Sequence, residues 1–459
     1  MRDTIERWFC LGARGTTVRR ELVGGATTFA TMAYIAVVNP AILAFAGIPV
    51  GPSTVATLLT AAFGTLLMGL YANRPIAVAP YMGENAFIAF GLAGLGISWQ
   101  ERLGAVFLAG VVFAAITLVG IRARLAASVS PSMKHAFGAA IGLFLAFIGL
   151  YETGIVTSAA SGMPAAALAR PDGLLAAPPV PVKIGDLRAA EPLLAVLGIV
   201  ITGTFLVRRV PGAILLGILV TAAIGASFGM ANAPTGVMAL PFVGDLSLAP
   251  VALQLDIGGA LRPALLPVLL TLFLMSFFDT LGTLVAVGNA AGLADENGDM
   301  PEIERPMLVD AATCAFAGLV GTSTSGAYIE SATGIREGAR TGLAACTTAA
   351  LFVVALFFVP LLEPLQHLRF AYGPALVVVG VLMVGSARRI DFDDLCEALP
   401  AVASIALVVF TYNIANGLTA GLLLHPVMKL LAGRVREVGA GSWALAALSA
   451  AYYGGGVMH

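Results

Sequence analysis

Long apolar stretches, interrupted by glycine, proline and charged residues, recur along the whole chain. A helix needs about 20 mainly apolar residues to cross the hydrocarbon core of a bilayer, and many of these stretches have about that length. The pattern predicts fourteen membrane spans, at residues 22–43, 52–70, 76–96, 103–121, 134–150, 190–207, 211–230, 263–292, 306–322, 324–340, 342–362, 370–386, 396–412 and 414–432. A further apolar stretch, 442–453, is too short to cross, and we expect it at the membrane interface or against the bundle.

The distribution of Lys and Arg supports this topology. With the N-terminus in the cytoplasm, nineteen of the 25 basic residues fall on the cytoplasmic side, where short loops are enriched in them. The remaining six are Arg102, Arg170, Lys183, Arg188, Arg262 and Arg369. Three of these lie in one long loop, 151–189, where the rule is weak. We therefore expect an integral protein of the cytoplasmic (inner) membrane with both termini in the cytoplasm.

Composition excludes several functional classes. The chain is 59% hydrophobic and only 11% charged, far from the range of soluble proteins. A net charge of -1 without basic clusters gives no surface for nucleic acid. The four cysteines and four histidines are scattered, so neither a disulfide framework nor a metal site is indicated, and no cofactor is expected.

Two short motifs occur twice, in the same order. Residues 36–41 resemble residues 286–291, an offset of 250 positions, and residues 83–86 resemble residues 329–332, an offset of 246. Similar offsets indicate a duplicated unit of seven spans. Because seven is odd, the second copy would enter the membrane inverted, an arrangement typical of secondary transporters, whose substrate sites lie at the repeat interface.

Three carboxylates inside predicted spans are the main candidates for a site, because ionisable side chains there are costly and usually functional. Glu84 follows Pro80 and Gly83 in the third span, Asp279 interrupts an apolar run in the eighth, and Glu330 lies in a stretch rich in Ser, Thr and Gly in the tenth. Such sequences favour discontinuous helices in spans three and ten. Irregular backbone at membrane depth survives only where it is buried in protein or lines a watery cavity, so these segments indicate a binding site.

Structural roles compete with this interpretation. The alternative is that Glu84 and Glu330 are helix-end residues that reach the headgroups and that Asp279 bonds a neighbouring helix. We interpret Asp310 as a buried partner or capping group rather than a ligand. In the first span, Thr28, Phe29 and Tyr34 are either packing residues or residues that face the site.

The chain resembles the nucleobase-cation symporter 2 family, in its branch of purine permeases. The resemblance covers nearly the whole sequence. Its motifs are residues 27–35 with Asn39-Pro40, Ala79-Pro80 with Met82-Gly83 and Asn85-Ala86, 134–136 with 142–144, 278–283, 321–324, 328–331 and 414–417.

The resemblance implies an all-α polytopic fold of fourteen spans in a 7+7 inverted repeat, with half-helices in spans three and ten preceded by short extended strands. It also implies a core domain that carries the substrate against a gate domain. The core would comprise residues 1–121 and 262–362, the gate residues 122–261 and 363–433, and residues 434–459 would form a C-terminal tail.

The resemblance further implies that Asp279 and Glu330 hold the substrate. The same motifs supply the other candidate substrate-binding residues, which are Glu84, Thr28, Phe29, Ala86, Phe87, Thr280, Thr283, Ser325, Tyr328 and Ile329. The family pattern is broken at two places: Tyr81 to Asn85 replace Gly-Met-Gly-Leu-Asn, and Ser325 to Ala327 replace a run of threonines. An extra carboxylate and fewer hydroxyls would border the pocket, so purine is the expected class rather than a specific base.

A neutral heterocycle suits these residues, because a carboxylate accepts two adjacent N–H groups at once and half-helix N-termini offer N–H groups to ring carbonyls. Burial favours the protonated form of an acid, so Glu84 or Asp279 is the candidate for proton coupling. The expected partners are a nucleobase, protons or another cation, the lipid bilayer and, as one option for assembly, a second copy of the chain.

Three alternatives remain. The transported solute is uracil or another heterocycle, or it is an anion, as in other transporters of the same 7+7 architecture, although three acids would repel an anion. An intramembrane aspartyl protease would need a Gly-x-Gly-Asp context, whereas Asp279 follows Phe277-Phe278. We therefore expect a transporter and not an enzyme.

Overall fold

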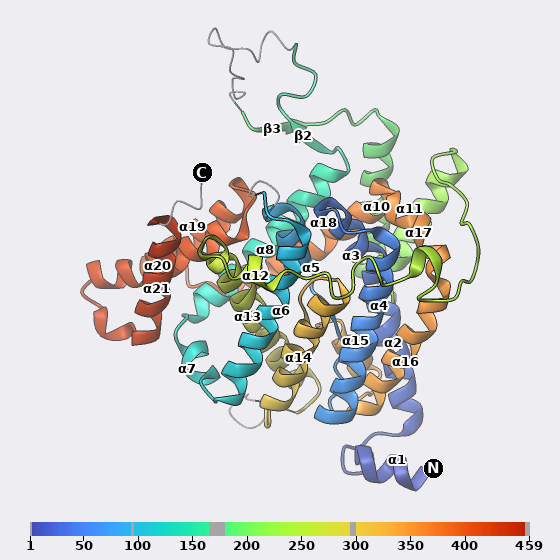
Figure 1. The fold of residues 1–459 in the computed structure, drawn as a ribbon, viewed down its shortest axis with the longest axis horizontal. Helices are drawn as coiled ribbons and strands as arrows, with labels where there is room; N and C mark the ends of the chain where they lie inside the picture. Colours follow the sequence, from blue (N-terminus) through green and yellow to red (C-terminus); the bar gives the residue numbers. More distant parts are fainter. Residues whose placement is uncertain (1, 93–95, 165–179, 294–299, 455–459) are drawn as a thin grey trace.

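The computed structural model describes residues 2–92, 96–164, 180–293 and 300–454, so Arg170 and part of the 151–189 loop lie outside the described residues. Figure 1 shows a bundle of helices with the N-terminal helix α1 (Arg2–Phe9) at one end. The hairpin of β2 (Val156–Ser158) and β3 (Val182–Ile184) projects from the opposite end.

The helices up to the middle of the chain are α2 (Val18–Met32), α3 (Ile35–Leu43), α4 (Val50–Leu67), α5 (Met82–Ala86), α6 (Trp99–Leu118), α7 (Arg122–Ala127), α8 (Pro131–Glu152), α10 (Ala190–Val207), α11 (Ala213–Ser227) and α12 (Ile257–Ala260). The later helices are α13 (Leu266–Ala290), α14 (Glu304–Val320), α15 (Ser331–Arg336), α16 (Gly342–Ala355), α17 (Val359–His367), α18 (Arg369–Val384), α19 (Leu395–Phe410), α20 (Ile414–Leu431) and α21 (Ala440–Gly454). Short 3-10 or π turns are η1 (Ala44–Ala46), η2 (Met68–Ala72), η3 (Phe87–Gly91), η5 (Gly244–Leu246), η6 (Pro263–Leu265), η7 (Leu356–Phe358), η8 (Gly385–Arg389) and η9 (Val435–Glu437). Two further strands are β1 (Val78–Pro80) and β4 (Ser325–Ala327).

Within the described residues, nine helical segments are long and apolar enough to cross a membrane, compared with fourteen predicted spans. Two of the differences fall on the predicted third and tenth spans, where α5 and α15 are short and each follows a strand. Pro80 lacks an N–H and the 321–334 stretch is rich in helix-breaking residues, so a continuous helix does not form in either place.

The first predicted span is also interrupted. Helix α2 ends at Met32 and α3 begins at Ile35, with Tyr34 at the junction. Periodicity alone did not show this break, because the residues on both sides are apolar helix formers. At this junction the Tyr34 side chain reaches Glu330, which lies between β4 and α15.

The helices pack as two groups. In the first group α6 packs on α14, α16 packs on α2 and α4, and β1 pairs with β4. In the second group α8 packs on α18 and α19, α10 packs on α11 and α18, and α19 packs on α20. Small residues allow close approach inside the second group: a Cβ at Gly142 of α8 would lie 2.6 Å from the carbonyl oxygen of Gly380 in α18.

The C-terminal helix α21 lies against the bundle, one of the two positions expected for this apolar segment. Its first turn is bonded through the Ser442 hydroxyl to the Ser128 carbonyl at 2.5 Å. Near its end the Tyr453 hydroxyl donates to the Asn416 carbonyl in the first turn of α20, at 2.7 Å. Helix α21 therefore runs antiparallel to α20 and covers part of its length.

Candidate functional site

The two interrupted spans meet in an antiparallel pair of strands inside the first helix group. Val78 pairs with Ala327 and Pro80 with Ser325, and all residues of both strands are buried. One backbone bond extends the ladder at each end: Tyr81 N–H donates to the Thr324 carbonyl and Tyr328 N–H to the Ala77 carbonyl, both at 2.9 Å. Isolated three-residue strands are otherwise unstable, so burial and these extra bonds stabilise the pair. We call this paired region, residues 77–81 and 324–328, the strand crossing.

This crossing has local two-fold symmetry. Tyr81 and Tyr328 each directly follow a strand, and their rings stack with centroids 6.1 Å apart and planes 9° apart. The Tyr81 hydroxyl lies 3.1 Å from the Thr280 hydroxyl, while the Tyr328 hydroxyl donates to the Pro80 carbonyl. Counted from the ends of the strands, the equivalent of Glu330 is Gly83 and not Glu84, so the motif alignment from the sequence was shifted by one residue here.

Four carboxylates surround the strand crossing, and they differ in their hydrogen-bond partners. They are Glu84, Asp279, Asp310 and Glu330. Glu330 accepts a hydrogen bond from the Tyr34 hydroxyl at 2.8 Å. Asp310 of α14 accepts from the Thr280 hydroxyl at 2.9 Å and from Ala327 N–H at 2.8 Å. This acid therefore joins α13 and β4, as expected for a buried structural partner.

Glu84 is fully buried, and neither of its carboxylate oxygens has a hydrogen-bond partner among the described residues. Asp279 lies close enough for its charge to act on Glu84, and the Tyr328 hydroxyl is within electrostatic range of both Glu84 and Glu330. In the part of the chain that the structure describes, no Lys, Arg or His forms an ion pair with any of these carboxylates. Acids without cations at membrane depth require a proton or a donor from another molecule.

The remaining candidate residues fall into two classes. Thr280, Ser325 and Tyr328 belong to the crossing or bond to it, and all three are buried. The others lie at its margin or in packing positions. Ala86 and Phe87 are fully enclosed, Thr28 is buried in α2, Phe29 packs edge-on against Phe352 at 5.1 Å, Thr283 is partly exposed, and the Ile329 side chain is 57% exposed.

Sequence reasoning missed Tyr81 and left Tyr34 undecided. Both contacts join residues that are far apart in the chain: Tyr34 bonds Glu330, and Tyr81 bonds Thr280. The signal that was available is positional, because Tyr81 and Tyr328 occupy equivalent places after Pro80 and Ala327. No group of three or more His, Cys, Asp or Glu residues suited to a metal ion occurs among the described residues.

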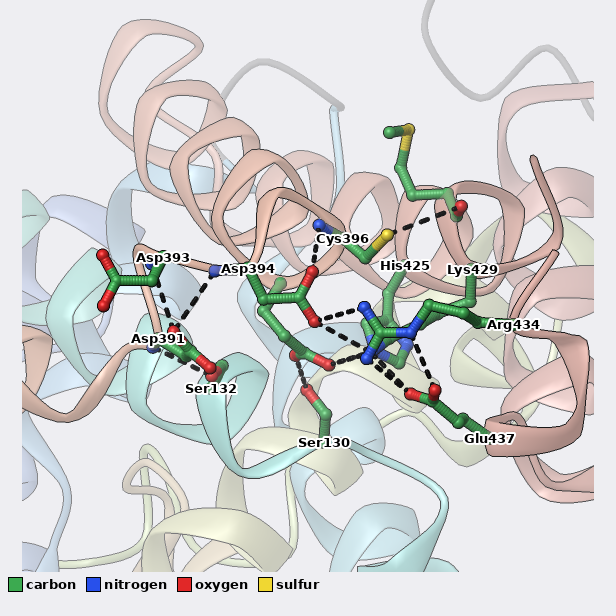
Figure 2. Close-up of polar contacts among 12 residues, drawn as sticks. Ser130, Ser132, Asp391, Asp393, Asp394, Cys396, His425, Lys429, Arg434 and Glu437 are labelled. Atoms are coloured by element: carbon green, nitrogen blue, oxygen red, sulfur yellow. Dashed lines mark hydrogen bonds and ion pairs between the residues drawn. The ribbon is translucent and has the colours of Figure 1, made fainter. Parts of the chain in front are cut away.

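A second cluster of charged residues lies in the other helix group, and we call it the paired cluster: Asp394, Glu397, His425, Lys429, Arg434 and Glu437 (Figure 2). Lys429 lies 3.3 Å from Asp394 and 3.0 Å from both Glu397 and Glu437. Arg434 lies 2.7 Å from Asp394 and from Glu437. His425 is 3.1 Å from Glu397, which also accepts the Ser130 hydroxyl at 2.6 Å.

The paired cluster stabilises its acids in the charged form. The Cys396 backbone N–H, together with Arg434, lowers the pKa of Asp394 to about 2. Hydrogen bonds from Arg434 and Lys429 lower the pKa of Glu437 to about 2. These acids remain ionised near neutral pH and join the start of α19, the end of α20 and η9.

Comparison with known proteins places most of the chain in one family. The model of the Permease family (Xan_ur_permease) matches residues 19–419. The chain is 37% identical to the guanine/hypoxanthine permease PbuG of Bacillus subtilis over 447 residues, which is 95% of this chain and 96% of that protein. It is also 37% identical to the adenine permease AdeQ of Escherichia coli over 436 residues, 95% of this chain and 93% of that protein.

Solved structures share the fold at low identity. The transmembrane domain of the cyanobacterial bicarbonate transporter BicA superposes with a TM-score of 0.59 at 17% identity, over 88% of this chain and 97% of that domain. SLC26A9 superposes with a TM-score of 0.59 at 13% identity, over 90% of this chain and 66% of that chain. These likenesses support the architecture and carry no information about the solute.

Proposed function

The chain belongs to the permease family of nucleobase:cation symporters, and on this premise we propose that it carries a purine base across the cytoplasmic membrane together with protons. It is an integral membrane protein and a transporter rather than an enzyme. Guanine, hypoxanthine, adenine and xanthine are the proposed substrate class.

The observation that carries this proposal is the group of acids without cations beside the strand crossing. A purine edge presents adjacent N–H donors, and a carboxylate accepts two of them with charge-assisted strength. Glu330 is the proposed main acceptor, because Tyr34 fixes one of its oxygens at 2.8 Å and leaves the rest of the carboxylate for a ligand. Asp279, which precedes the buried Thr280 on α13, is the proposed second acceptor.

Glu84 is the proposed proton carrier. Its side chain is fully buried, and its oxygens lack partners within the described residues. Two nearby acids titrate as a coupled pair, so taking up one proton would relieve the repulsion between Glu84 and the partly exposed Asp279. Binding of a neutral base and of a proton at one site would then couple uphill transport of the base to the proton gradient.

We further propose that the first helix group, with residues 1–121 and 262–362, moves as the substrate carrier. The second group, with residues 122–261 and 363–433, would act as the fixed gate. The β1–β4 pairing joins segments from both halves of the carrier, which supports its motion as one unit. Residues 434–459 would stay with the gate, since α21 lies along α20.

Anion transport is the competing function, and the fold shared with BicA and SLC26A9 neither favours nor excludes it. The acids at the crossing oppose it, because each ionised carboxylate would repel an anion in a medium of low dielectric. Uracil, whose N3–H can donate to a carboxylate oxygen, or another heterocycle with N–H groups remains the alternative.

Uptake into proteoliposomes tests these proposals directly. Purified protein would be given radiolabelled hypoxanthine, guanine, adenine, uracil, bicarbonate or sulfate, with and without an inward proton gradient. We expect accumulation of at least one purine that requires the gradient and no uptake of either anion. Uptake of bicarbonate or sulfate without uptake of any base would overturn the proposal.

A further inference from the structure

A buried chain of polar side chains connects four segments behind the strand crossing. Asn39 of α3 lies at its centre and is fully buried. Its Nδ2 donates to the Thr57 hydroxyl at 2.7 Å and to the Thr322 hydroxyl at 2.9 Å. Its Oδ1 accepts from Asn85 Nδ2 at 2.8 Å and from the Ser323 hydroxyl at 3.1 Å.

The direction of these hydrogen bonds follows from proton counting. Thr57 donates its single hydroxyl proton to the Ser53 carbonyl at 2.7 Å, and a carbonyl only accepts. The Thr322 hydroxyl, 3.3 Å from Thr57 Oγ1, can then only donate to it. Thr57 Oγ1 can therefore only accept from Asn39, so the NH2 group of Asn39 must point toward it. Oδ1 of Asn39 then faces Asn85, and Asn85 must turn its own NH2 group toward Asn39.

Asn85 is left with a defined chemical character. Its Nδ2 protons are directed to Asn39 Oδ1 and to the Met82 sulfur at 3.6 Å. Its Oδ1 is buried and has no hydrogen-bond partner among the described residues, and both oxygens of the adjacent Glu84 are in the same state. Asn85 of α5 thus presents only an acceptor, next to the carboxyl group of Glu84. Buried acceptors without partners are rare, which indicates that a donor group binds here.

We propose that Asn39 is a positioning residue that sets substrate specificity. Because Thr57 donates to Ser53, Asn39 must donate to Thr57 and accept from Asn85, and Asn85 Oδ1 is thereby kept facing the ligand as an acceptor. We call this series of hydrogen bonds, from Ser53 through Thr57 and Asn39 to Asn85, the relay. The site then selects heterocycles that present an N–H at this position and rejects those with a bare ring nitrogen, because two acceptors would face each other. This assignment of the ligand rests on the proposed function, whereas the hydrogen-bond relay does not.

A matched pair of substitutions at Thr57 tests the specificity. T57S keeps the hydroxyl and therefore the direction of the relay, whereas T57V removes it. In T57V the Thr322 and Ser323 hydroxyls can rotate to accept or donate, so Asn39 and Asn85 can both flip. The Kd values of hypoxanthine, which has an N–H at ring position 1, and of purine, which has a bare nitrogen there, would be measured for each variant.

We expect wild type and T57S to prefer hypoxanthine over purine by a similar factor and T57V to lose at least fivefold of that preference. A purely structural role for Thr57 would weaken the binding of both ligands equally and leave the ratio unchanged. T57V with the same ratio as T57S would overturn the proposal.

A second measurement needs no substrate. N85D replaces the donating NH2 of Asn85 by an oxygen, which conflicts with Asn39 Oδ1 as long as Thr57 holds Asn39 in place. At pH 8 we expect N85D to lower the apparent melting temperature by about 2 °C more in the T57S background than in T57V, where Asn39 can turn its NH2 group. If N85D lowers the melting temperature equally in both backgrounds, the proposed chain of hydrogen bonds from Thr57 to Asn85 is refuted. If the melting temperatures differ as expected but the protein binds no base, only the proposed function is refuted.

Discussion

The acids of the strand crossing and the acids of the paired cluster have the same chemistry and opposite surroundings. In the paired cluster Lys429 and Arg434 hold Asp394, Glu397 and Glu437 at ion-pair distances, so charge is neutralised inside the protein. At the crossing, Glu84 and Asp279 lie near each other, and no described ion pair involves either residue. Among the described residues, Lys429 and Arg434 neutralise acids in the second helix group, and no ion pair reaches the acids of the crossing.

The difference indicates where free energy is used for folding and where it is reserved for a ligand. A paired acid gains its stabilisation when the chain folds and has little left to give to a solute. An unpaired buried acid destabilises the empty protein and gains a partner only when a proton or an N–H donor arrives. Substitutions in the two regions should therefore change different measurements.

The largest effect is expected for Glu330→Gln. The amide turns an N–H face toward the base and can accept only through one oxygen, so binding should weaken by about 2 kcal/mol or more, a factor of about 30. Isothermal titration with the best substrate measures it, and Glu437→Gln in the paired cluster is the control that should bind as wild type does. Equal affinities of the Glu330 variant and wild type would remove this residue from the site.

Asp279→Asn should reduce transport by about tenfold or more, as expected for loss of one charge-assisted hydrogen bond, while the protein still folds and inserts. Uptake into proteoliposomes measures the transport, and size-exclusion chromatography with thermal unfolding reports folding. A variant that fails to accumulate, or melts earlier without substrate, would assign Asp279 to helix packing instead.

Glu84→Gln should separate binding from coupling. The amide imitates the protonated acid, so substrate should still bind and exchange across the membrane, but accumulation driven by a proton gradient should be lost. Counterflow and gradient-driven uptake, measured on the same liposomes, distinguish the two activities. If this variant concentrates substrate as well as wild type does, Glu84 is not the coupling residue; weaker binding with uptake still driven by pH would make it a substrate contact.

Lys429→Met should act in the opposite way, on stability and not on affinity. Removing the buried ammonium leaves three carboxylates around Arg434 and His425, so the apparent melting temperature should fall by about 2–4 °C. Substrate affinity should change by less than about twofold, since the cluster lies in the other helix group. A large loss of affinity at unchanged stability would end the division of roles between the two regions.

The smallest effect concerns pH. The pKa values of Asp394 and Glu437 are lowered to about 2 in the folded protein, so their stabilisation is present above the pKa of about 4 expected for an unfolded chain and is lost as the pH falls toward 2. Melting curves of wild type and Glu437→Gln should therefore converge between about pH 4 and pH 2 and stay separate above pH 5. A constant difference down to pH 2 would show that Glu437 acts through packing and not through its charge.

The sequence predicted the membrane class and singled out three of the acids that lie around the strand crossing, because a carboxylate in an apolar run is conspicuous without any knowledge of its neighbours. Glu84, Asp279 and Glu330 were found in this way. The pattern did not show which of them would be satisfied, since the partner of Glu330 is Tyr34 and that of Asp310 is Thr280. Such contacts depend on how two inverted halves meet, and no periodicity within either half encodes this.

Asn39 and Asn85 illustrate the same limit more sharply. Both belong to motifs that carried the family resemblance, yet nothing in their spacing predicts that one amide orients the other. The relay depends on the Ser53 carbonyl, a backbone atom that no residue type reveals. Conversely, the short break between α2 and α3 at Tyr34 went undetected because hydrophobicity does not report a local interruption of the helical hydrogen bonds.

The pairing of β1 with β4 has a consequence for how the protein is made. Strand β4 follows β1 by roughly 245 residues, and at about 5–20 residues per second a ribosome needs at least about 12 seconds to deliver it. During that interval the backbone groups of Val78 and Ala79 have no strand partner while the segments around them already insert. Nascent chains should therefore hold the third span in a hydrated or chaperoned site, and chains released before β4 should be substrates for membrane proteases.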